Sequence, residues 1–191
     1  MEKKTGGGIW LHSIPPHKTL KRGSRGCLVL REDKIKKVDP FIKVNQRAPI
    51  LIYSKVEYIT QEQLKVKRNE FMKWLNQWKR DWESKSSRKY MSHYSKNFYA
   101  LGRNYKGWKK YKKAVSSKTR SISVDLKNTV VYKNKDQYVV KFLQDYRSSN
   151  VKDFGEKTLY VKLENNKPKI VTESWKHEVK KEVLGSLSLT R

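Results

Sequence analysis

The spacing of apolar residues predicts one long amphipathic helix near the middle of the chain. Apolar side chains recur there at separations of three, four and seven positions, so they share one face. That face holds Leu64, Phe71, Trp74, Leu75, Trp78 and Trp82. Thr60 and Gln63 have the spacing of a capping box, which places the start of the helix. Core packing is the expected role of the aromatic stripe, in preference to a ligand platform.

Two shorter helices are predicted after the long one. Ser86 and Ser87 end the long helix and cap the second, whose inner side carries Tyr90, Met91 and Tyr94. Gly102 separates it from a third helix, which bears Trp108, Tyr111 and Val115. His93 falls on the second helix without an acidic or cysteine partner at ligand spacing, so it is interpreted as structural.

From Thr119 onward the period of the pattern changes to two, which predicts β-strands. The expected strands are 121–126, 129–132, 137–147, 158–163 and 169–175, with turns at 133–136 and 165–166. Three helices followed by an antiparallel meander predict an α+β fold whose sheet curls around the long helix. Asp125, Asp145, Asp153 and Glu173 lie on or beside these strands, but no His–Asp pair suggests chemistry there.

The first 56 residues are predicted to be structurally separate from the rest of the chain. Strands are expected around residues 10–12 and at 48–53, a strand or helix start at 27–31, and a turn at Glu32-Asp33-Lys34. A stretch of about fifty residues has little interior of its own. The pattern therefore divides the chain into a short first part at 1–56, a complete domain at 57–176 and a tail at 177–191.

The net charge of the chain limits the classes of partner that it can bind. The chain has 191 residues and a formal net charge of +27, and residues 57–119 hold 17 Lys and Arg against five Asp and Glu. Such a field attracts polyanions of any kind. No nucleic-acid motif occurs and the aromatics fall at core spacing, so no specific nucleic acid is expected. An anionic cell wall and a merely solvated basic surface remain open. No transmembrane segment or signal peptide is found.

The candidate catalytic residues are the single cysteine, Cys27, and His12, which lies fifteen positions before it. A thiol becomes a strong nucleophile as the thiolate, and a neighbouring imidazole can take its proton. Pro15-Pro16 and Gly23 favour a turn that brings the two together. Gly26 lets the backbone approach a substrate carbonyl. The alternative is that Cys27 is a small buried hydrophobe and His12 a structural residue.

The segments Ile9-Trp10-Leu11-His12-Ser13 and Gly23-Ser24-Arg25-Gly26-Cys27-Leu28-Val29-Leu30 resemble the signature of L,D-transpeptidase (YkuD-type) catalytic domains. These enzymes act on peptide stems of bacterial peptidoglycan. The Arg-Gly-Cys form is most similar to the murein L,D-carboxypeptidase branch that sets cell shape, in which a nuclear-transport-factor-type domain follows. The element order from residue 57 onward is similar to that domain's cone.

The resemblance implies the roles of the site residues. Cys27 is the nucleophile, His12 the general base, and the carbonyl of Ser13 orients the imidazole; the family usually has glycine at that position. The amides around Gly26 and Cys27 form the oxyanion hole. Ser24, Arg25 and Gly26 are predicted to bind substrate, and the positive charge of Arg25 suits its terminal carboxylate. No metal or cofactor is implied. The partner is a peptidoglycan stem peptide, and the location is the periplasm or cell envelope.

The resemblance also implies the architecture: the C-terminal part of a YkuD-type β-sandwich followed by a nuclear-transport-factor-like cone. Only a few residues precede the His12 strand, so the first part of the sandwich and any targeting segment are expected upstream of this sequence. The predicted function is that of a cysteine L,D-carboxypeptidase or L,D-transpeptidase connected with cell shape. The alternative is a basic, non-catalytic module that binds cell wall or nucleic acid.

Overall fold

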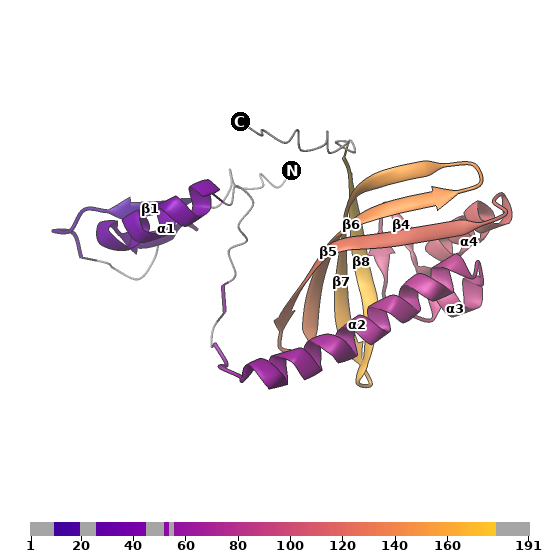
Figure 1. The fold of residues 1–191 in the computed structure, drawn as a ribbon, viewed down its shortest axis with the longest axis horizontal. Coiled ribbons are helices and arrows are strands. Elements are labelled where there is room, and N and C mark those ends of the chain that lie inside the picture. Colours follow the sequence, from indigo (N-terminus) through magenta and orange to yellow (C-terminus); the bar gives the residue numbers. More distant parts are fainter. Residues whose placement is uncertain (1–9, 20–25, 45–51, 54–55, 179–191) are drawn as a thin grey trace, which may run out of the picture. The chain divides into compact units, whose positions relative to one another are not determined.

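The structure is a computed structural model that describes residues 10–19, 26–44, 52–53 and 56–178 (Figure 1). The chain divides into two compact units, 1–54 and 55–191. The first unit holds the candidate thiol, and the second holds the large core.

In the first unit, strand β1 (Leu11–Ile14) pairs in parallel with strand β2 (Leu28–Arg31), and helix α1 (Glu32–Val44) follows β2 directly. The predicted turn at Glu32-Asp33-Lys34 is therefore wrong. Those residues form the first turn of α1, where acidic side chains favour the helix N-terminus, and Glu32 pairs with Lys36 at 2.7 Å.

The described residues of this unit form one two-stranded sheet and no β-sandwich. Most of the strand predicted at 48–53 lies outside the described residues. Ile52 and Tyr53, which are described, have no regular secondary structure.

The second unit begins with helix α2 (Gln61–Glu83), and the predicted capping box is present: Thr60 and Gln63 exchange hydrogen bonds of 3.0 and 3.1 Å. Helix α3 (Ser87–Met91) is capped by Ser86. A short hairpin follows, made of β3 (Tyr99–Ala100) and β4 (Arg103–Asn104). Helix α4 (Tyr105–Ser117) starts at the side chain of Asn104, which accepts from the amide of Gly107.

Three details of the helix predictions need correction. Leu64 is exposed, because the first two turns of α2 carry no buried side chain. His93 follows α3 instead of lying on it. On α4 only Trp108 is buried, whereas Tyr111 and Val115 are partly exposed.

Four long strands form one antiparallel sheet in the order β5-β6-β7-β8. Their bounds are Ile122–Asn134, Gln137–Ser148, Lys152–Glu164 and Lys167–His177. The two strands predicted at 121–126 and 129–132 are one strand, β5, whose register shifts between Lys127 and Val130. Asn128 has φ +53° there, which asparagine tolerates better than most residues.

The core lies between the helices and one face of this sheet, with α2 running along it (Figure 1). Leu75 and Trp78 of α2 are fully buried, as are Val140 and Leu159 of the sheet. The α+β class with a curved antiparallel sheet is thus confirmed for this unit. Within the described residues, no helix combines the length and apolar character needed to cross a bilayer.

Candidate functional site

The parallel pairing of β1 and β2 brings the segments of His12 and Cys27 together. Leu11 pairs with Leu28, and the amide of Leu28 donates to the carbonyl of Trp10 at 2.8 Å. His12 pairs with Val29, two positions after Cys27, and Cys27 directly precedes β2. For strands about 4.8 Å apart with about 3.3 Å per residue, an offset of two positions corresponds to roughly 8 Å between Cα atoms.

The imidazole of His12 has a defined hydrogen bond. Its Nδ1 lies 3.2 Å from the carbonyl oxygen of Ser13. A carbonyl oxygen only accepts, so Nδ1 is the donor in this contact. His12 is exposed and Cys27 half-buried. This arrangement allows Nε2 to act as a base.

Gly26, immediately before the thiol, has φ +98°. An L-residue with a side chain rarely adopts this conformation, so the position requires glycine. Ser24 and Arg25, the other predicted substrate-binding residues, lie outside the described residues, as does Gly23.

In the second unit, a buried charged cluster lies on the core side of the sheet. Lys157 on β7 donates to Oε1 of Glu173 on β8 at 2.5 Å, and both side chains are almost fully buried (8% and 3% exposed). The hydroxyl of Tyr94 donates to Oε2 of the same carboxylate at 2.8 Å, and Tyr94 in turn hydrogen-bonds to Tyr90. Burial raises the pKa of Glu173, but Lys157, Lys112 and these hydrogen bonds outweigh it, so the net pKa is lowered.

Lys112 of α4 adds a second cation beside this cluster. Its ammonium lies 4.8 Å from the ring centre of Trp108, 4.9 Å from that of Trp82 and 5.7 Å from that of Tyr90. Burial lowers the pKa of Lys112 to about 8; the Glu173 carboxylate partly opposes this, and Lys157 adds to it. The rings stabilise the charged form by cation–π contact.

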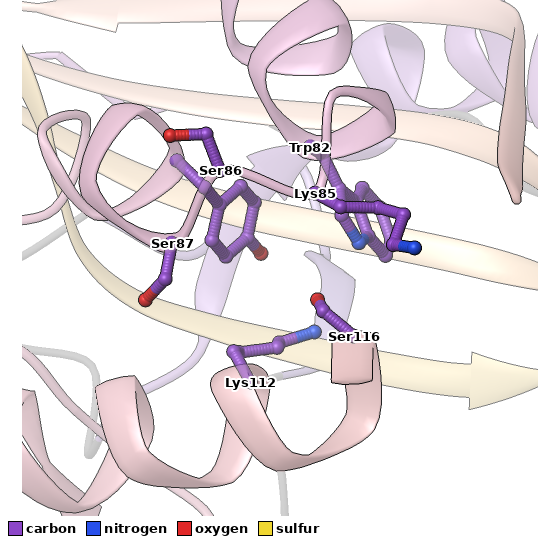
Figure 2. A pocket seen from close by; sticks show the side chains of 7 residues that line it. Trp82, Lys85, Ser86, Ser87, Lys112 and Ser116 are labelled. Atoms are coloured by element: carbon purple, nitrogen blue, oxygen red, sulfur yellow. The ribbon is translucent and has the colours of Figure 1, made fainter. Parts of the chain in front are cut away.

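A small pocket opens over this ammonium (Figure 2). It is lined by Trp82, Lys85, Ser86, Ser87, Tyr90, Lys112 and Ser116. Figure 2 shows Lys112 extending from α4 toward Trp82 across the pocket. Its free volume of about 10 Å³ is close to what one water molecule needs. Cations, serine hydroxyls and aromatic faces at its mouth suit contact with the edge of a small anionic group such as a carboxylate.

Two His–Asp contacts form in this domain that the sequence did not indicate. Nε2 of His93 lies 2.8 Å from Oδ2 of Asp81 inside the core, and Nδ1 of His177 lies 2.9 Å from Oδ1 of Asp153 near the surface. Burial lowers the pKa of His93, although Asp81 opposes this. His93 is buried, and its acidic partner comes from α2, twelve positions earlier.

Sequence reasoning missed Lys157, Lys112 and the role of Glu173. The alternating pattern of the strands carries a usable signal, since Lys157 and Glu173 occupy positions whose neighbours in the pattern are apolar. Their pairing depends on the register of β7 and β8, in which Leu159 is opposite Glu173.

Comparison with family models matches residues 70–174 to the Cds6 C-terminal NTF2-like domain. The chain belongs to this family. The match runs from within α2 to within β8, so the buried cluster and the Lys112 pocket lie within the NTF2-like domain. Comparison with curated protein sequences gives no match.

Solved structures extend the similarity beyond that domain. The structure of Bd1075 from Bdellovibrio bacteriovorus is 39% identical with a TM-score of 0.84, over 93% of this chain and 64% of that one. The helical cell shape determining protein Pgp2 from Campylobacter jejuni is 24% identical with a TM-score of 0.68, over 88% and 61%. An NTF2-like protein from Pseudomonas putida KT2440 shares the fold, at 12% identity and a TM-score of 0.53. The chain thus spans less than two thirds of the first two relatives.

Proposed function

We propose that this protein acts on the peptide stems of peptidoglycan in the cell envelope, as a cysteine L,D-carboxypeptidase or L,D-transpeptidase that influences cell shape. The observation that supports the proposal is the β1–β2 pairing, in which His12 is opposite Val29, two positions after Cys27. Similarity to Pgp2, a cell-shape determinant, supports the biological setting. The NTF2-like fold alone implies no reaction, because such cones serve enzymes and passive pockets alike.

The chemistry follows from the orientation of His12. Nδ1 is engaged by the Ser13 carbonyl, so Nε2 takes the thiol proton of Cys27 and the thiolate attacks the carbonyl before a D-residue. The C–N bond breaks, His12 returns the proton to the leaving amine, and a thioester remains. Water resolves it in a carboxypeptidase, whereas an acceptor amine resolves it in a transpeptidase. Amides near Gly26 stabilise the oxyanion, and Arg25 holds the terminal carboxylate.

The NTF2-like domain has a supporting role in this proposal. A stem peptide carries carboxylates, and the Lys112 pocket offers a cation, hydroxyls and aromatic faces within one small space. The free volume is close to that of one water molecule, so the pocket could contact the edge of such a carboxylate at its mouth without enclosing it.

A non-catalytic binding module is the second candidate. The net charge of +27 favours it, because electrostatic attraction alone holds a basic domain on an anionic wall. It differs from the first proposal in predicting that Cys27 has no special reactivity.

Thiol reactivity and turnover test the proposal. We expect a chloroacetamide reagent to label Cys27 at neutral pH faster than it labels a cysteine in an unstructured peptide. Loss of the base in His12→Gln lowers that rate by about tenfold or more. His17→Gln is the matched control, because His17 is an exposed histidine of the same unit and has no assigned role.

Release of D-alanine from muropeptides, lost in Cys27→Ala, would complete the evidence. Ordinary labelling of Cys27, together with no release by this chain or by a form extended upstream, would reject the enzymatic proposal and leave the binding module.

A further inference from the structure

The segment 84–124 contains twelve Lys and Arg and no Asp or Glu. It forms α3, the β3–β4 hairpin and α4, which are consecutive in the NTF2-like domain. A stretch of this length with charges of one sign repels itself and receives no internal compensation. Its surface is therefore complementary to an anionic partner.

The tip of the β3–β4 hairpin, Leu101-Gly102, carries an apolar side chain that the turn itself does not favour. Leu101 and Gly102 both have positive φ, 49° and 71°. A two-residue turn of this kind favours asparagine or glycine at its first position, and leucine is disfavoured there. Leu101 is nevertheless 69% exposed and Tyr99 is 61% exposed. Neither side chain is explained by the turn or by the core.

Basic side chains follow this tip along the chain. The guanidinium of Arg103 donates to the carbonyl of Leu101 at 3.0 Å and stacks over the ring of Tyr111, 4.8 Å from its centre. On α4, Lys106 and Lys110 are one turn apart and exposed. We call Tyr99, Leu101, Arg103, Lys106, Lys110 and Tyr111 the tip surface.

We propose that the tip surface docks on an anionic lipid bilayer, with Leu101 and Tyr99 entering the headgroup region and the basic residues contacting lipid phosphates. The basic side chains by themselves would attract any polyanion. An exposed leucine, however, is not buried by binding to a nucleic acid or a hydrated glycan. In a bilayer interface, apolar and aromatic side chains gain from burial while nearby lysines gain from the surface potential. The combination of exposed apolar and basic side chains therefore favours an anionic lipid bilayer over a nucleic acid or a glycan. The inference is independent of the Cys27 chemistry.

Co-sedimentation of the full chain with vesicles tests this. We expect binding to vesicles of equal parts phosphatidylcholine and phosphatidylglycerol, and little binding to phosphatidylcholine alone. Lys106→Glu with Lys110→Glu lowers the partition coefficient by roughly tenfold or more. Lys65→Glu with Lys73→Glu on α2 is the matched control: it makes the same charge change on another exposed helical face and lowers the coefficient much less.

Leu101→Asn separates lipid docking from general charge attraction. Asparagine tolerates positive φ better than leucine, so the variant keeps or gains thermal stability. It lowers binding to anionic vesicles by roughly fivefold and leaves binding to a single-stranded oligonucleotide unchanged.

Three results would each overturn the proposal. One is equal binding to both kinds of vesicle, and another is an equal loss in the α2 control. The third is a Leu101→Asn variant with unchanged vesicle binding while the lysine pair weakens vesicle and oligonucleotide binding alike, which would indicate a general polyanion surface.

Discussion

The buried ion pair Lys157–Glu173 affects the free energy of unfolding differently from the surface ion pairs of this chain. An exposed pair such as Lys43–Asp39 contributes little, because water and salt screen it. Lys157 and Glu173 are both almost fully buried, so each depends on the other for compensation. Removing one partner leaves an unpaired charge in the core, which is costly.

Glu173→Gln is therefore expected to lower the free energy of unfolding by about 3 kcal/mol at neutral pH, measured by urea denaturation. The pKa of Glu173 is lowered from its ordinary 4.5 by folding, so the carboxylate stabilises the fold above that value. Its contribution is lost as the pH falls through the folded pKa. The difference between wild type and Glu173→Gln should narrow accordingly in acid.

The double variant Lys157→Met/Glu173→Leu is the control for this prediction, because it removes both charges and keeps apolar volume. It should be more stable than the single variant. A double variant that loses more than Glu173→Gln would contradict the interpretation as a mutually compensated pair.

At the scale of elements, β7 and β8 approach each other closely at Gly155. A Cβ placed there would lie 2.3 Å from the carbonyl oxygen of Lys176 and 2.9 Å from the ring of Trp175. The nearer atom is backbone, so it cannot move aside without disturbing the strand. Gly107 on α4 is different, since its nearest neighbour would be at an ordinary 3.5 Å.

The two glycines give a matched pair of predictions. Gly155→Ala should lower the free energy of unfolding by about 1–3 kcal/mol through overpacking. Gly107→Ala should raise it by about 0.5–1 kcal/mol, because alanine is the better helix former. Thermal and urea unfolding measure both changes. A neutral Gly155→Ala would mean that β8 is free to shift at this end.

For the whole molecule, the net charge of +27 affects stability as well as the choice of partner. Like charges on a folded surface repel one another and destabilise the compact state. Salt reduces this repulsion, since the Debye length is about 10 Å at 0.1 M and shorter above it.

We expect the melting temperature to rise as sodium chloride is added from low to moderate concentration. Potassium chloride at equal ionic strength should give the same rise, because screening does not depend on the cation. A melting temperature that stays constant or falls would show that the charges are already compensated locally.

The local pattern was sufficient for most elements of the NTF2-like domain. The α2 stripe, its capping box and the alternating strands were predictable, because helix and strand periods impose their spacing on apolar residues. The β5 bulge at Lys127 was not, since a register shift depends on the partner strand. The helical start at Glu32 was also missed, because the residues that begin α1 are equally common in turns.

For the candidate site, the sequence determined which residues have the chemistry: a lone thiol, an imidazole fifteen positions away, and a glycine before the thiol. Tertiary structure decided which residues meet. The pairing of β1 with β2, the joining of Asp81 to His93, and the burial of Lys157 against Glu173 each connect segments whose spacing along the chain carries no contact information. Side-chain chemistry is local and can be read from the sequence, whereas the distance between two side chains depends on how the backbone folds between them.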